Sequence, residues 1–110
     1  MISNDRMNFL KPIMRTDAYS KYMTPFANIY LIRWSPKSRP NIHKHDGKQC
    51  SFIVLNGSLH ECRFLNNTIG GLYKSHLLKA FQVYSINDKE GYHQIYNFDD
   101  KIKYSIHKYV

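Results

Sequence analysis

A series of short β-prone runs, separated by turn signals, is the feature that most limits how this chain can fold. The first clear run, residues 29–34, is β-branched and aromatic and ends at Ser35-Pro36. Asn56-Gly57 lies between two later runs and predicts a hairpin turn. Short strands at regular spacing are typical of an antiparallel barrel or sandwich. The expected strands are residues 29–34, 41–45, 49–55, 58–65, 72–78, 81–85, 92–96 and 103–109.

The chain has 110 residues, which is enough for one domain with one core. We expect an N-terminal arm over residues 1–20 and a single barrel domain over residues 21–110. The arm is expected to be weakly structured or to form one short helix over residues 8–14. Pro12 argues against a longer helix there, because proline lacks the amide hydrogen that an interior helical turn needs.

Composition excludes several classes of protein. No apolar run approaches the ~20 residues of a membrane span, and the N-terminus lacks the apolar stretch of a signal peptide. Two cysteines, Cys50 and Cys62, do not make a disulfide framework. We therefore expect a cytoplasmic protein that does not enter membranes. The net charge of +8 favours anionic partners, but compositional drift explains it better than a nucleic-acid-binding surface.

Three histidines have a spacing that suits a metal ion. His43 and His45 stand two positions apart on an extended segment, so their side chains point to the same face. His93, on a later strand, can converge on them inside a barrel. Each imidazole must be neutral and held in one tautomer to bind a metal, and strands fix side-chain directions well. The two histidines that lack this context are expected at the surface: His60 and His76.

The same segments resemble the two motifs of a cupin. Residues 40–50 read PNIHKHDGKQC, and residues 91–97 read GYHQIYN. The position of the usual acidic ligand holds Cys50, and this substitution is similar to the cysteine dioxygenase family. Further similarity lies in LIRW at 31–34, GSLHE at 57–61 and SIHKY at 105–109, so the resemblance runs from about residue 19 to 109. It implies an all-β, small single-domain cupin, an antiparallel barrel or jelly roll.

The resemblance also implies an activity. A thiol dioxygenase oxidises a small thiol, such as cysteine, to its sulfinic acid with O2 at an Fe(II) held by three histidines, here His43, His45 and His93. Most oxygen-activating iron sites use two histidines and one carboxylate. Three neutral imidazoles leave the full +2 charge on the iron, which favours an anionic thiolate. The expected protein is therefore a non-heme iron oxidoreductase whose partners are a thiol and O2.

The last strand adds further candidate residues. Ser105, His107 and Tyr109 alternate and so share one face. The resemblance implies that Tyr109 places its hydroxyl near the iron, that His107 orients Tyr109, and that Ser105 supports His107. Cys50 and Tyr109 match two positions that are covalently joined in some family members, so a thioether cross-link is an expectation. The alternative for Tyr109 is an aromatic side chain that closes the end of the barrel.

The expected substrate-binding residues are Tyr19, Lys21, Ile32 and Trp34. The family usually has a Tyr-x-Arg step whose arginine binds the substrate carboxylate, and the matching stretch here is Tyr19-Ser20-Lys21. Lysine is a point charge without the planar fork of arginine, so its hold on a carboxylate is looser. Cysteine, cysteamine, a mercapto-acid and an N-terminal cysteine all stay open as substrates, and Lys21 as a surface residue is the alternative.

Other functions compete with this interpretation. A metal-binding cupin with another activity, or with none, keeps the histidines but does not need Tyr109. A basic, tyrosine-rich barrel that binds single-stranded nucleic acid uses the net charge, but it gives no reason for the histidine spacing. A second subunit that covers the mouth of the pocket also stays open, because the chain is short for the family.

Overall fold

The structure is a computed structural model that describes residues 12–43, 49–86 and 92–109. Across these ranges it contains no helix with the length and apolar character that crossing a lipid bilayer requires. The described elements are β1 (Pro12–Arg15), β2 (Tyr19–Met23), β3 (Ile29–Trp34), β4 (Cys50–Val54), β5 (Ser58–Phe64), the 3-10 turn η1 (Ile69–Gly71), β6 (Leu72–Lys79), β7 (Val83–Ile86), β8 (Tyr92–Tyr96) and β9 (Lys103–Tyr109).

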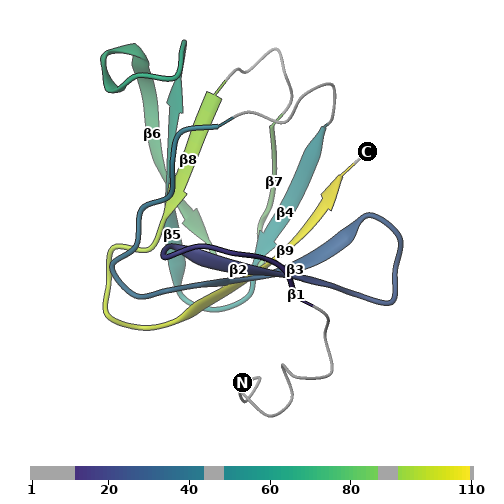
Figure 1. Cartoon of the computed structure of the whole chain (residues 1–110). Coiled ribbons are helices and arrows are strands. Elements are labelled where there is room, and N and C mark those ends of the chain that lie inside the picture. The colour runs from purple at the N-terminus through teal and green to yellow at the C-terminus, as the bar shows by residue number, and fades with distance from the viewer. Residues whose placement is uncertain (1–11, 44–48, 87–91, 110) are drawn as a thin grey trace.

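The strands form two antiparallel sheets that face each other. The larger sheet has the order β1-β2-β3-β9-β4-β7, and the smaller has the order β6-β5-β8. In Figure 1 the smaller sheet stands across from β4 and β7 of the larger one. The chain crosses to the smaller sheet after β4, returns to the larger sheet for β7, crosses again for β8 and returns for β9, as in a jelly roll. The expectation of an all-β cupin fold is confirmed.

The core lies between the two sheets. Alternation along each strand turns one set of side chains inward, as the burial of β9 illustrates: Ser105 and His107 are buried, whereas Ile106 is exposed. Both sheets contribute to one apolar cluster, which contains Ile32, Trp34, Cys50, Phe52, Val54, Leu59, Leu78, Ile86 and Ile95. Some inward positions carry polar side chains instead, and these belong to the candidate site described below.

The strongest sequence patterns predict their strands best. The expected strands at 29–34, 92–96 and 103–109 coincide with β3, β8 and β9. The short helix expected over residues 8–14 is wrong in its described part, because Pro12–Arg15 form β1 and pair with β2. A proline is tolerated on an edge strand such as β1, where its missing amide costs no ladder hydrogen bond. The expected arm boundary at residue 20 falls within β2.

The hairpin expected at Asn56-Gly57 is also wrong, although the turn itself forms. Gly57 has a φ of +63°, the left-handed conformation that the sequence suggested. The strands on either side belong to different sheets, because β4 pairs with β7 and β9 whereas β5 pairs with β6 and β8. The Asn56 side chain accepts from the amide of Tyr104 (2.8 Å) and donates to the carbonyl of Ile102 (3.0 Å). These bonds fix the turn against the start of β9.

Replacing Gly57 with alanine should destabilise the fold. An added Cβ would force an L side chain into the left-handed region, at a cost of about 1–2 kcal/mol, and would clash with Nζ of Lys103. That ammonium forms a 2.7 Å ion pair with Asp99, so the ion pair must move as well. Urea unfolding should give a lower midpoint for Gly57→Ala. Gly70→Ala is the matched control, since its Cβ meets only Thr68 Oγ1 at 3.9 Å; equal midpoints for the two variants would contradict this account.

Candidate metal and substrate site

His43 and His93 are held side by side by their own backbones. The amide of each donates to the carbonyl of the other, with N···O distances of 3.0 Å from His43 and 2.7 Å from His93. They form an isolated antiparallel bridge between the segment before β4 and the strand β8. Side chains of directly opposed residues lie on the same face of such a bridge. The two Nε2 atoms are accordingly 3.2 Å apart.

The partners of the other ring nitrogens decide where the protons lie. His43 Nδ1 is 3.1 Å from the carbonyl oxygen of Asn41, which can only accept, so Nδ1 carries the hydrogen. His93 Nδ1 is 2.9 Å from Oε2 of Glu61 and donates to that carboxylate in the same way. Burial, followed by the proximity of His93, lowers the pKa of His43 and favours its neutral form. With their Nδ1 atoms occupied in this way, both rings turn Nε2 toward the same point.

This arrangement fits a metal ion. When both rings are neutral and carry their hydrogens on Nδ1, two nitrogen lone pairs face one point, and imidazole nitrogen is a common ligand of transition metals. Among the described residues, no group of three His, Cys, Asp or Glu side chains is arranged around one point in a way that suits a metal. His45, the third expected ligand, lies outside the described residues. His43 and His93 are thus the two ligands whose geometry is described.

The two histidines open onto a cavity of about 180 Å³. Its walls include all four expected substrate-binding residues, and the register of β2 against β3 explains why. Tyr19 pairs with Trp34 and Lys21 pairs with Ile32, so alternate positions of both strands face the same way. The cavity is lined by Met14, Tyr19, Lys21, Ile32, Trp34, His43, His93, Ile95, His107 and Tyr109.

Lys21 and Tyr109 form the polar part of this cavity. The ammonium of Lys21 donates to Oη of Tyr109 at 3.2 Å, and it also lies over two aromatic rings, 4.6 Å from the centroid of Tyr30 and 4.3 Å from that of Tyr109. A cation in such a position is attracted by the negative faces of the rings. Lys21 therefore points inward at the site, and the positive charge that an anionic substrate requires is present beside the histidines.

Cys50 lies directly opposite Tyr109 in the pairing of β4 with β9. The hydroxyl of Tyr109 hydrogen bonds with the sulfur, and the pKa of Tyr109 is raised by burial and by this neighbour. The thiol itself is fully buried and free of a disulfide. The two side chains that the resemblance joins in a cross-link are therefore adjacent in space.

A second series of contacts reaches Cys50 from the other side. The indole of Trp34 donates to Oγ of Ser105 at 2.8 Å, and Ser105 Oγ is 2.7 Å from Nε2 of His107. His107 Nδ1 is 3.7 Å from the sulfur of Cys50. The indole can only donate, so Ser105 accepts from Trp34, and the contacts continue through His107 to Cys50. We expected His107 to orient Tyr109; in this series it reaches Tyr109 by way of the sulfur.

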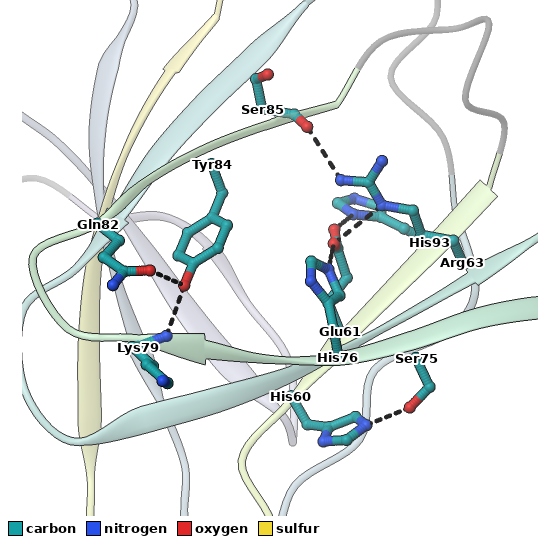
Figure 2. A network of polar contacts seen from close by, with 10 residues as sticks. All are labelled: His60, Glu61, Arg63, Ser75, His76, Lys79, Gln82, Tyr84, Ser85 and His93. Carbon is teal, nitrogen blue, oxygen red and sulfur yellow. Dashed lines mark hydrogen bonds and ion pairs between the residues drawn. The ribbon is translucent and has the colours of Figure 1, made fainter.

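Sequence analysis missed Glu61, which binds His93 from behind. Glu61 is fully buried, and its carboxylate accepts hydrogen bonds from His93, His76 and Arg63, as Figure 2 shows. Burial alone would raise the pKa of Glu61, but the hydrogen bonds from His93 and His76, with the charge of Arg63, lower it to about 2. The sequence signal that could have identified Glu61 was an acidic residue at an inward-facing position of the strand 58–64.

The two histidines that were expected at the surface differ in their surroundings. His60 bonds to Ser75 Oγ and its ring lies near those of Tyr96 and Phe98. The expectation is wrong for His76, whose side chain is 27% exposed and whose Nε2 donates to Oε1 of Glu61. The reason lies in the pairing of β5 with β6, which sets His76 directly opposite Glu61 and could not be read from local sequence.

Alkaline pH should destabilise the protein without the cross-link, in which Cys50 is a free thiol as in this structure. Burial, partly offset by the Tyr109 hydrogen bond, raises the pKa of this thiol from 9.0 to about 12. Above pH 9 the unfolded chain loses this proton while the folded chain keeps it, so the free energy of unfolding falls by about 1.4 kcal/mol per pH unit. Urea unfolding of the wild type and of Cys50→Ser between pH 8 and pH 11 should give a shallower decline for the variant. Parallel declines would contradict this assignment.

Comparison with known proteins now identifies the family. The family model of cysteine dioxygenase type I matches residues 25–110. No curated protein sequence matches the chain.

Solved structures resemble the fold at low sequence identity. The cupin domain of Drosophila melanogaster CENP-C is 17% identical with a TM-score of 0.71, over 94% of this chain and 77% of that one. CENP-C of the same organism, bound to CAL1, is 15% identical with a TM-score of 0.70, over 100% and 85%. The Lactobacillus farciminis oxalate decarboxylase formate complex is 19% identical with a TM-score of 0.72, over 94% of this chain and 31% of that one. These likenesses show the cupin fold.

The family match covers most of the chain, and the cupin fold agrees with it. The family match supports a metal-dependent, oxygenase-like role for an enzyme of the cupin type. The chain belongs to the cysteine dioxygenase type I family of the cupin superfamily.

Proposed function

We propose that this protein is a thiol dioxygenase that binds Fe(II) through His43, His45 and His93. The observation that carries the proposal is the 3.2 Å approach of two Nε2 atoms whose rings are each held through Nδ1. Such a pair is typical of a metal site, because outer partners of this kind fix the tautomer of ligating histidines. The same cavity contains a lysine and a tyrosine hydroxyl, the groups that a charged thiol substrate and its oxidation require.

The overall reaction adds both atoms of O2 to one sulfur, so that R–SH becomes R–SO2H. When bound, Fe(II) would supply Lewis acidity and a path for the four electrons that the sulfur gives up to O2. Three neutral ligands leave its charge undiminished, which favours a substrate thiolate. The residues of the chain do the rest: Lys21 attracts an anionic group of the substrate, while Ile32 and Trp34 form apolar walls that exclude water.

Tyr109 is the proposed catalytic hydroxyl. It accepts a hydrogen bond from Lys21 and donates toward Cys50, so its proton and its orientation are both fixed. Ser105 and His107 hold Cys50 from the other side. A thioether between Cys50 Sγ and a ring carbon of Tyr109 is part of the proposal; its formation removes two protons and two electrons, which O2 accepts. Such a bond fits the groups around Cys50. A thioether sulfur has no hydrogen, and both the ring of His107 and the hydroxyl of Tyr109 can donate to it.

The chemistry of the site also bears on the substrate. Lys21 takes the place of the family arginine and offers one ammonium instead of a planar fork. We propose a small thiol, either cysteine or a relative, in a cytoplasmic setting, where the free thiol of Cys62 is stable. If Lys21 binds a carboxylate, cysteine and 3-mercaptopropionate should react with a lower KM than cysteamine does, and Lys21→Met should remove that difference.

An oxygen electrode tests the proposal directly. Protein loaded with one Fe(II) per chain, confirmed by elemental analysis, should consume O2 when it is given cysteine, cysteamine or 3-mercaptopropionate. Mass spectrometry should find one sulfinate formed for each O2 consumed. Absence of O2 uptake with every thiol at full iron occupancy would remove the proposal.

A differently acting or non-catalytic metal-binding cupin is the second candidate. The position of Lys21 favours it, because the ammonium is already engaged by Tyr109 and by two rings. This candidate retains metal binding but does not depend on the hydroxyl of Tyr109. The two candidates therefore differ in how they respond to the loss of that hydroxyl.

A further inference from the structure

Glu61 is a charged side chain in the interior of the molecule. It lies at the middle of β5, the central strand of the smaller sheet, and it is 0% exposed. An isolated carboxylate in such a place is strongly destabilising unless donors compensate for the lost water. Here the donors come from all three strands of the sheet, with Arg63 on β5 itself, His76 on β6 and His93 on β8.

The two oxygens of the carboxylate have different partners. Oε1 accepts from Nε of Arg63 at 3.0 Å and from Nε2 of His76 at 2.5 Å. Oε2 accepts from Nδ1 of His93 at 2.9 Å. Arg63 is itself held by the carbonyl of Ser85 on β7, at 3.0 Å. Figure 2 shows the carboxylate of Glu61 in the centre of these groups, with His93 on one side and His76 on the other. The carboxylate is therefore fixed on both oxygens.

We infer that Glu61 is a positioning residue for His93, and that Arg63 and His76 hold it in place for this task. The inference rests on the proposed function in one respect, namely that His93 is a metal ligand. Oε2 requires a hydrogen on Nδ1 of His93, so in the neutral ring the single proton stays off Nε2, which faces His43. The carboxylate thereby keeps the ligand nitrogen available and keeps the ring in the plane that points it into the cavity.

The number of donors around residue 61 predicts how the variant Glu61→Gln should behave. In Glu61→Gln the amide has one oxygen and one NH2 group, yet three donors face it. If the NH2 faced Arg63 and His76, it would meet the N–H of Arg63, which cannot give up its proton. The oxygen should therefore stay with that pair, and the NH2 should face His93. The neutral imidazole can adapt by moving its own proton from Nδ1 to Nε2, where it blocks the ligand position.

The test reads the tautomer of His93 in metal-free protein. Long-range 1H–15N correlation spectra of protein labelled with 15N in histidine separate Nδ1–H from Nε2–H rings, and His93→Gln identifies the signal. The wild type should show His93 as the Nδ1–H tautomer, and Glu61→Gln should shift it to Nε2–H. Anaerobic competition between the protein and a chelator for Fe(II) should give an affinity about 10- to 100-fold lower for Glu61→Gln, the usual effect of removing such a partner.

Leu78→Ala is the matched control for lost stability. Leu78 is fully buried in the same sheet, on β6, but it lies in the apolar core away from the cavity. It should lower the urea midpoint and leave both the His93 tautomer and the Fe(II) affinity unchanged. If Glu61 had only a structural role, Glu61→Gln would likewise lower the urea midpoint and leave the His93 tautomer and the Fe(II) affinity unchanged.

The outcomes separate this inference from the proposed function. A wild-type His93 protonated on Nε2 would overturn the inference even if Glu61→Gln did not fold. Unchanged tautomer and affinity in Glu61→Gln would overturn it while leaving the metal site intact. If the tautomer shifts as expected but the wild type binds no Fe(II), the positioning role stands and the proposed function fails.

Discussion

Replacing His93 with alanine should abolish stoichiometric iron binding and, with it, O2 consumption. The Nε2 atom of His93 forms half of the described ligand pair, 3.2 Å from that of His43. The ring is 2% exposed and is held by Glu61, so its removal takes away one of the two ligand atoms that the described residues present. Iron per chain, measured by elemental analysis after anaerobic loading and desalting, should fall to background.

His60→Ala provides the matched control for this experiment. His60 is a second histidine of the smaller sheet, but its Nε2 bonds to Ser75 and it does not line the cavity. Iron content and O2 uptake should remain at the wild-type level. Full iron occupancy in His93→Ala would show that the metal binds elsewhere.

Replacing Tyr109 with phenylalanine should leave iron binding intact and slow the oxidation by about 100-fold or more, the usual contribution of a proton-transferring group. The change keeps the ring beneath the ammonium of Lys21, 4.3 Å from its centroid, and removes only the hydroxyl. The loss of this hydroxyl removes the acceptor of the Lys21 hydrogen bond and the hydrogen bond with Cys50. The turnover rate at saturating thiol, measured with an oxygen electrode, reports this loss separately from any change in KM.

Tyr84→Phe is the control for removing a tyrosine hydroxyl elsewhere. The hydroxyl of Tyr84 accepts from the amide of Lys79 and donates to Gln82, at the turn between β6 and β7. Its loss should not alter turnover. Equal turnover in Tyr109→Phe and wild type would favour the second candidate, a cupin that needs the metal but not the hydroxyl.

Local patterns predict much of this fold because alternation and turn residues act over short distances. The runs that became β3, β8 and β9 are β-branched or aromatic and end at clear breaks, so their bounds were readable. The strand β1 was not, since its stability comes from pairing with β2 and not from its own sequence. The Asn56-Gly57 turn shows the same limit: the left-handed glycine was predictable, but the sheet to which each strand belongs was not.

For the candidate site too, features set by local sequence were predictable and features set by strand pairing were not. The histidine spacing and the alternation of Ser105, His107 and Tyr109 are local, and the structure brings His43, His93 and the last strand to one cavity. Glu61 and His76 escaped notice, because their roles depend on the pairing of β5 with β6 and β8. The role of a buried carboxylate depends on the hydrogen-bond donors of neighbouring strands, which the local sequence does not identify.

The coordination of bound iron is the most direct test of the whole account. A crystal structure of the iron-loaded protein should show Nε2 atoms of residues 43, 45 and 93 on the metal, with Glu61 on the far side of the His93 ring. It should also show Tyr109 and Lys21 facing the positions left for substrate. A carboxylate bound to the iron, or a His93 ring turned away from it, would contradict the account.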